Sequence, residues 1–126
     1  MALTDAGAIL IAQMVRGASV TALNAANAYI GVGNSTTAFA ASQTDLVGAS
    51  KTRKAMDSGY PSGASNVLTY QSTFGTSDAN HAWDEWGLFN AGPSGGTMLG
   101  RKVDALGTKV NTQSWTFQVT ATFSAT

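Results

Sequence analysis

The feature that most constrains this chain is a turn signal between two apolar runs in the segment 80–103. The turn, residues 91–96, is Ala-Gly-Pro-Ser-Gly-Gly, and runs bearing Trp, Leu, Phe and Val flank it. This pattern predicts a β-hairpin. Side chains alternate along its first arm, so that Trp83, Gly87 and Phe89 lie on one face and Ala82, Trp86 and Leu88 lie on the other. Each face therefore carries an aromatic side chain. We therefore expect a strand covered on both faces, and a hairpin that is the core of the fold.

Composition narrows the class of protein. A chain of 126 residues fits a single domain, residues 1–126. The absence of cysteine excludes disulfides, zinc–thiolate sites and cysteine nucleophiles, and fits assembly in a reducing cytoplasm. With 7 basic and 7 acidic residues, the chain has no basic surplus for binding nucleic acid. Only 11% of residues are charged, so the surface suits contact with partners; an uncharged soluble monomer is the alternative.

No membrane association is expected. The longest apolar run, residues 6–15, is about half the length needed to span a bilayer and contains Gln13. No Lys or Arg precedes it, so it is not typical of a signal peptide.

An N-terminal helix is predicted over residues 4–16. Thr4 or Asp5 can cap its start, and Gly17 can end it. Its apolar stripe is formed by Gly7, Leu10, Ile11, Met14 and Val15. Ile9 lies off this stripe, either as a single exposed apolar residue or as a contact with a second subunit.

The rest of the chain is rich in strands and turns. Strands are predicted at 28–32 and 66–74, and most clearly at 115–123, where apolar side chains alternate with Ser, Thr and Gln. Loops or turns are predicted at 17–27, 38–50 (with Asp45-Leu46-Val47 tucked in), 57–63, 75–80 and 104–109. The fold class is therefore mainly β: an antiparallel sandwich or flattened barrel of five or six strands, from about residue 28 to 124, with one N-terminal helix.

Two short segments have competing interpretations. Lys51-Thr52-Arg53-Lys54 is either a solvated edge strand, which lysine protects from pairing, or a patch for an acidic partner. The glycines of Gly31-Val32-Gly33 resemble a phosphate loop in spacing but lack its other residues, so a turn leaving a strand is the better interpretation.

No catalytic, cofactor-binding or metal site is predicted, and we expect the protein not to be an enzyme. His81 is the only histidine, with Asp78, Asp84 and Glu85 nearby, and these residues match neither a catalytic triad nor a metal-binding spacing. Asp84 and Glu85 are adjacent and should point to opposite faces of a strand, which makes them poor acid–base partners. We expect the carboxylates to pair with Arg or Lys, or to accept backbone hydrogen bonds near the hairpin.

The three tryptophans, Trp83, Trp86 and Trp115, allow two interpretations. Aromatic residues at strand spacing favour the core, whereas an exposed platform would stack against sugars. Carbohydrate or receptor binding therefore stays open as a minor alternative.

Five segments from about residue 27 onward carry a resemblance to known proteins. They are residues 27–37 (Asn-Ala-Tyr-Ile-Gly-Val-Gly-Asn-Ser-Thr-Thr), 41–46 (Ala-Ser-Gln-Thr-Asp-Leu), 73–80 (Thr-Phe-Gly-Thr-Ser-Asp-Ala-Asn), 85–90 (Glu-Trp-Gly-Leu-Phe-Asn) and 95–101 (Gly-Gly-Thr-Met-Leu-Gly-Arg). In these segments the chain resembles small structural proteins of tailed bacteriophages, including the attachment domains of tail-collar and tail-fibre proteins and stand-alone virion proteins of similar length.

The resemblance implies a virion structural protein assembled in the host cytoplasm. Its first implied role is a capsid decoration or cement protein on the major capsid protein; a tail, neck or fibre-attachment role is the alternative. The charge-poor composition, Ile9 off the helix stripe and a central strand apolar on both faces together predict a symmetric homo-oligomer. The resemblance implies a trimer as first choice. A small enzyme is the class that the residues favour least.

Overall fold

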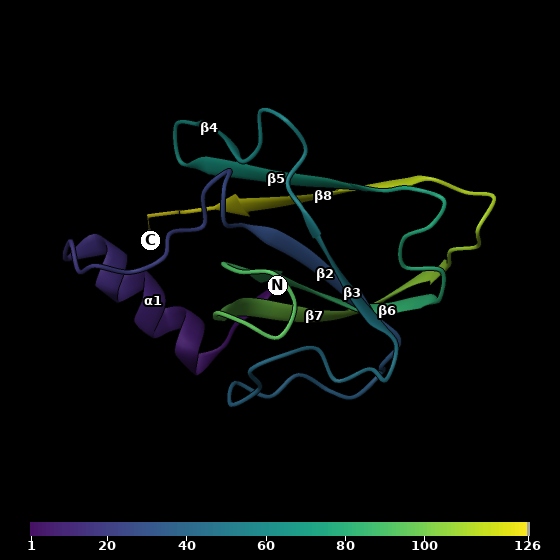
Figure 1. Cartoon of the computed structure of the whole chain (residues 1–126). Helices are drawn as coiled ribbons and strands as arrows, with labels where there is room; N and C mark the ends of the chain where they lie inside the picture. The colour runs from purple at the N-terminus through teal and green to yellow at the C-terminus, as the bar shows by residue number, and fades with distance from the viewer. Residues whose placement is uncertain (126) are drawn as a thin grey trace.

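The computed structural model describes residues 1–125, which form two antiparallel sheets and one helix (Figure 1). One sheet has the strand order β1-β7-β6-β2-β3, and the other has the order β4-β5-β8. The elements are β1 (Ala2–Leu3), α1 (Asp5–Val15), β2 (Tyr29–Gly33), β3 (Lys51–Ala55), β4 (Ser62–Ala64), β5 (Val67–Phe74), β6 (Ala82–Phe89), β7 (Met98–Thr108) and β8 (Trp115–Thr122). The predicted class, mainly β and sandwich-like with one N-terminal helix, is confirmed.

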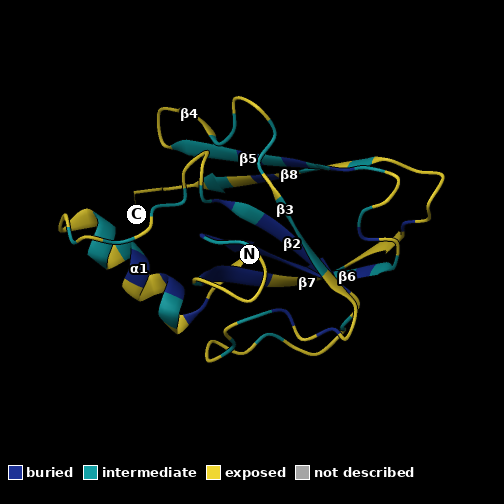
Figure 2. Ribbon diagram, in the orientation of Figure 1, coloured by how far each residue is buried: buried dark blue, intermediate teal, exposed yellow. Residues whose placement is uncertain are grey.

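The predicted hairpin is the centre of the larger sheet. Its arms are β6 and β7, and β6 lies in the middle of the five strands, between β7 and β2. The turn closes through Asn90, whose side-chain Oδ1 accepts a 2.7 Å hydrogen bond from the Thr97 amide. Figure 2 shows β2 and the first half of β7 coloured as buried. β6 itself is buried from Glu85 to Phe89, so the expectation of a central strand covered on both faces is confirmed.

A β-bulge changes which faces the hairpin's aromatic residues occupy. The β6–β7 register shifts near the start of β6, so the simple alternation is broken there. Trp83 and Trp86 consequently both contact Phe117, at ring-centroid distances of 6.1 and 5.4 Å. Phe89 belongs to a separate cluster on the opposite face. The prediction that Trp83 shares a face with Phe89 is therefore wrong.

The second arm is longer than the sequence indicates. β7 continues to Thr108, so the turn predicted at 104–109 is wrong. Trp83 of β6 lies opposite Gly107, and this pairing keeps the segment extended although it contains turn-forming residue types. The turn follows instead at residues 110–113.

Aromatic edge-to-face contacts join the two sheets. The ring of Trp83 meets Phe74 of β5 at 4.8 Å and Trp115 of β8 at 4.9 Å, with interplanar angles of 70° and 74°. Trp86 meets Phe117 at 86°. Phe74 and Trp83 are fully buried, so these contacts form the centre of the core.

The helix begins and ends as predicted. Thr4 caps α1: its Oγ1 accepts from the Gly7 amide at 2.9 Å and donates to the Met98 carbonyl at 2.6 Å. Gly17 adopts a φ of +75° just after the helix. A Cβ at Gly7 would lie 2.0 Å from the Leu99 carbonyl oxygen, so only glycine lets the helix lie this close to β7.

Some apolar side chains are less buried than the patterns predict. Val15, assigned to the helix stripe, is 83% exposed, and Phe123 is 57% exposed because it follows the last paired residue of β8. In the 38–50 crossing Leu46 is buried as predicted, whereas Val47 is 43% exposed. Ile9 is also exposed in the single chain.

Replacing Trp86 by Ala should lower the free energy of unfolding by about 3–5 kcal/mol, because a buried ring and its edge-to-face partner are lost. Urea unfolding followed by circular dichroism measures this. Val15→Ala is the matched control and should stay within about 0.5 kcal/mol of the parent, since Val15 is exposed. Equal effects from both substitutions would contradict the observed core.

Candidate functional site

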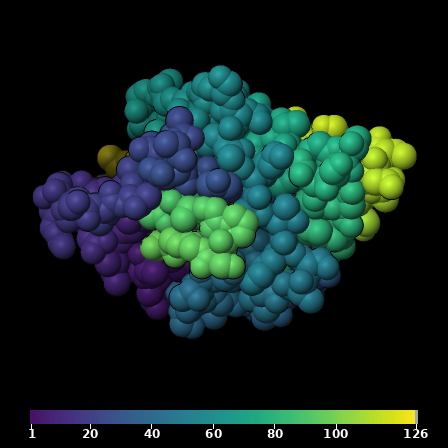
Figure 3. Space-filling model, viewed as in Figure 1, coloured from purple at the N-terminus to yellow at the C-terminus, as the bar shows by residue number. Residues whose placement is uncertain are grey.

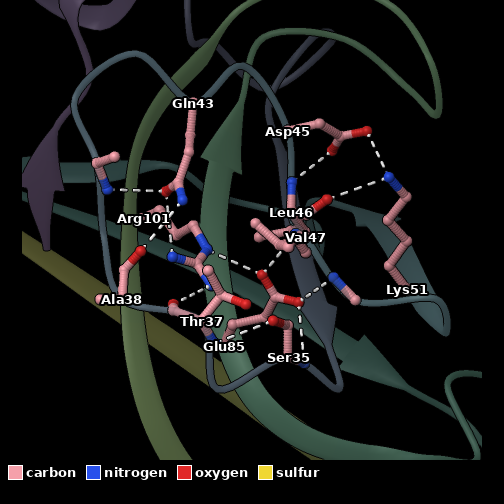
Figure 4. Close-up of polar contacts among 12 residues, drawn as sticks. Ser35, Thr37, Ala38, Gln43, Asp45, Leu46, Val47, Lys51, Glu85 and Arg101 are labelled. Carbon is pink, nitrogen blue, oxygen red and sulfur yellow. Dashed lines mark hydrogen bonds and ion pairs between the residues drawn. The ribbon is translucent and has the colours of Figure 1, made fainter.

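The largest polar cluster surrounds Glu85, in the middle of β6. Glu85 and Arg101 of β7 are both fully buried, and the Arg101 Nε donates to Glu85 Oε1 at 2.9 Å (Figure 4). The carboxylate also accepts three backbone amide hydrogen bonds, from Ser35 at 3.1 Å, Val47 at 2.8 Å and Gly48 at 2.6 Å. Four donors thus converge on one carboxylate, which makes it a structural group that holds the long 34–50 loop.

Two glycines give the carboxylate its room. A Cβ at Gly33 would lie 2.6 Å from Glu85 Oε2, and a Cβ at Gly48 would lie 2.7 Å from the same oxygen. Of the two glycines whose spacing superficially resembles a phosphate loop, Gly33 therefore leaves room for an internal carboxylate, whereas a Cβ at Gly31 would meet the Phe89 ring. This agrees with the rejection of a nucleotide role on sequence grounds.

The guanidinium of Arg101 holds the other side of the loop. Its Nη1 donates to Gln43 Oε1 at 3.1 Å and its Nη2 to the Thr37 carbonyl at 2.9 Å. Gln43 in turn donates to the Ala38 carbonyl and accepts from the Ala40 amide. The cluster therefore fixes the irregular crossing from β2 to β3, as Figure 4 shows.

A second arginine fastens the hairpin turn to the edge of the sheet. Arg53 of β3 lies 3.7 Å above the Phe89 ring, and its Nη1 donates to the carbonyls of Ala91, Gly92 and Gly95. In Figure 3 the hairpin turn lies against the β2–β3 crossing on the visible face. A hollow of about 290 Å³ lies between Asp45, the start of β3 and the turn residues Pro93 and Ser94.

The segment 51–54 is an edge strand, as one of its two interpretations predicted. Its lysines are partly exposed: Lys51 pairs with Asp45 and Lys54 with Asp78, each at 2.9 Å. Arg53 departs from the prediction of a solvated edge, because its side chain is only 7% exposed.

His81 makes structural contacts. Its Nδ1 lies 2.8 Å from the Ala82 carbonyl, which can only accept, so Nδ1 carries the proton. Its Nε2, 3.2 Å from Thr52 Oγ1, then accepts from that hydroxyl. Asp78 contacts Lys54, and Glu85 contacts Arg101, so neither forms a triad with His81. Asp84 is half-buried on β6.

The carboxylates near the β3 edge have depressed pKa values. A hydrogen bond from Lys54, assisted by the Gly75 amide, holds the pKa of Asp78 below its usual value. Partial burial raises the pKa of Asp57, but hydrogen bonds from Thr73 and Gln71 outweigh it and the net shift is downward. Of the carboxylates that the sequence predicted to be paired, Asp78 and Glu85 form ion pairs, with Lys54 and Arg101.

Lys109 is a buried cation that sequence reasoning missed. Its side chain donates to the Gly75 carbonyl at 2.6 Å and to Asn80 Oδ1 at 2.9 Å. It thereby fixes the 75–80 connection into β6. Its place as the last residue of the predicted 104–109 turn gave no signal of burial.

The tryptophans form a core and also border a hollow. Trp83 and Trp86 are buried, as the core interpretation predicted, but Trp115 is only half-buried. A hollow of about 350 Å³ lies beside it, lined by Trp83, Leu106, Ser114, Trp115, Thr116 and Phe117. A further hollow of about 330 Å³ lies at the other end of β8, lined by Met1, Leu3, Ile11, Leu99 and residues 120–123.

Within residues 1–125, no group of three His, Asp or Glu side chains is arranged to hold a metal ion. Over the same residues, no helix is long and apolar enough to cross a membrane.

Comparison with known proteins gives no match: neither a protein-family model, nor a curated protein, nor a solved structure is significantly similar to this chain.

Removing either partner of the buried pair should be strongly destabilising. Glu85→Ala or Arg101→Ala leaves an uncompensated buried charge, which costs about 3–5 kcal/mol in the free energy of unfolding. The exposed Lys102–Asp104 pair on the same strand is the matched control, and Asp104→Ala should cost at most about 1 kcal/mol. Similar losses at both pairs, measured by urea unfolding, would contradict the structural role given to Glu85.

Replacing His81 by Ala should leave partner binding unchanged, because its ring contacts only Thr52 and a backbone carbonyl. Circular dichroism shows whether the variant folds, and the binding assay set out under the proposed function is then run on the variant and the parent. A variant that folds normally but loses a catalytic turnover present in the parent would contradict this expectation.

Proposed function

We propose that this protein is a structural component of a bacteriophage virion and acts through protein–protein contacts. The virion part of the proposal rests on the resemblance described above, and the observation that supports protein–protein contacts is the distribution of polar and apolar groups. Arg101, Glu85 and Lys109 are buried inside the fold, while Leu3, Leu106 and Phe123 are exposed. A charge-poor surface with exposed apolar side chains suits permanent contact with other subunits.

The position in the particle is proposed from the size of the chain and its compact β fold. Capsid decoration, on the major capsid protein, is the first choice for a compact β domain of this size. A tail, neck or fibre-attachment position is the alternative, since segments that include 27–37 and 85–90 also resemble collar and fibre attachment domains. In either position the protein resides in the virion, is assembled in the host cytoplasm and forms a homo-oligomer, for which the resemblance implies a trimer first.

Glycan binding is a second candidate function, supported by one observation. The half-buried ring of Trp115 borders the 350 Å³ hollow, together with Phe117 and the polar side chains of Ser114 and Thr116. Aromatic faces beside hydroxyl groups suit a sugar ring. Screening against a glycan array tests it, with Trp115→Ala as the variant that should abolish any signal.

The main proposal is tested with purified phage particles and empty capsids. We expect the protein to bind them, and binding to change little between about 0.1 and 1 M salt, because apolar and backbone contacts are hardly screened. Copy number then places it: on the order of hundreds per particle indicates capsid decoration, and roughly six to fifteen indicates the tail or neck. Absence from the particle together with no binding to capsids would overturn the proposal.

A further inference from the structure

β8 is an unprotected sheet edge. It pairs along its whole length with β5, and no other strand within residues 1–125 pairs with it. Its eight residues, Trp-Thr-Phe-Gln-Val-Thr-Ala-Thr, contain no charge, no proline and no glycine. Alternate backbone amides and carbonyls of such a strand point away from its neighbour. β8 therefore presents a row of free hydrogen-bonding groups to solvent.

The other edges carry the features that prevent pairing. β3, at one edge of the larger sheet, bears Lys51, Arg53 and Lys54. β1 has two residues and β4 has three, which is too short for stable pairing with another chain. The part of β7 beyond β1 bears the Lys102–Asp104 ion pair and Gly107 at a φ of +104°. Among the described strands, β8 alone is long, regular and uncharged at its edge.

Apolar surface accompanies this edge. The two hollows described above lie at its two ends, one beside Trp115 and Phe117 and the other beside residues 120–123. Leu106 is exposed at the first hollow, and Leu3 and Phe123 at the second. Strand pairing alone buries little surface area between two chains. Contact through these apolar side chains brings the buried area closer to the roughly 1,600 Å² that is typical of stable interfaces.

We propose that β8 pairs antiparallel with β8 of a second copy, around a two-fold axis perpendicular to the smaller sheet. This inference rests on the proposed function only in that both include self-association of the protein. It adds the surface and the symmetry of that contact. It yields a continuous six-stranded sheet across two copies, since each contributes the three strands β4, β5 and β8. The two-fold pair, rather than a trimer, is then the basic unit.

The sequence of β8 is complementary to itself in this arrangement. A perpendicular two-fold axis keeps inward residues opposite inward residues, so the pairing centres on a single residue. Centred on Gln118, it places Thr116 opposite the partner's Thr120 on the outer face. On the inner face it places Phe117 opposite the partner's Val119. Thr–Thr and aromatic–β-branched pairs are favourable across antiparallel strands, and no like charges meet.

The test places lysines at one edge or the other of the same sheet. The β8 variant carries Thr120→Lys with Thr122→Lys, and the control β4 variant carries Ser62→Lys with Ala64→Lys. The positions match because residues 62, 69 and 120 lie in one row across the sheet, and residues 64, 67 and 122 lie in another. All four substituted side chains are exposed. We expect analytical centrifugation to show a dimer for the parent and the β4 variant. The β8 variant should dissociate at least about tenfold more readily, because lysine on a strand disfavours edge pairing.

Hydrogen exchange gives an independent readout. Amides of β8 that point away from β5 should become protected as protein concentration rises in the parent and the β4 variant, and stay unprotected in the β8 variant. A parent that is monomeric at about 1 mM, or trimeric with those amides unprotected, overturns the inference. Equal dissociation of both variants does so as well. A monomeric parent that still binds capsids overturns this inference alone, whereas a dimer that is absent from the particle and does not bind capsids overturns only the proposed function.

Discussion

The structure depends on the buried contact between Glu85 and Arg101. Removing two charges from water is unfavourable, and a buried pair is tolerated only when hydrogen bonds satisfy its remaining atoms. Glu85 here accepts from three backbone amides besides Arg101, and Arg101 donates to Gln43 and to a loop carbonyl. An apolar pair of equal volume would leave those loop groups without partners inside the protein. The pair thus organises the backbone of a long irregular loop more than it joins two strands.

Arg53 applies the same principle to the hairpin turn. Its guanidinium satisfies three carbonyls of the turn and lies on the Phe89 ring, so one cation replaces the strand pairing that an irregular turn cannot make. Lys109 does so for the 75–80 connection. Glu85, Arg101, Arg53 and Lys109 therefore satisfy loop backbone groups. The surface has few charges mainly because only 11% of the residues are charged, and the burial of Glu85, Arg101 and Lys109 reduces their number further.

Patterns among neighbouring residues predicted much of the fold, whereas features that depend on residues far apart in the sequence were missed. The cap at Thr4, the glycine at 17 and the alternation in β8 are encoded by neighbouring residues, and the structure has them. The bulge near Trp83 and the full length of β7 depend on how two strands align, which alternation within one strand cannot show. The Glu85 site was missed in detail because its donors lie 37 to 50 residues away in a segment without periodicity. The sequence signal that could have revealed the site is a charged residue within each apolar arm of the hairpin, Glu85 in one arm and Arg101 in the other.

The distribution of protected and unprotected edges bears on how assembly stops. An open strand edge normally risks unlimited association, because each added strand exposes another edge. Pairing of β8 with itself uses the open edge of both copies at once, and the outer edges of the resulting sheet are then two copies of the three-residue β4. The cations on β3 and the short β1 protect the larger sheet in the same way. A two-fold contact through β8 would therefore close on itself, whereas a head-to-tail contact would require one of the protected edges to pair.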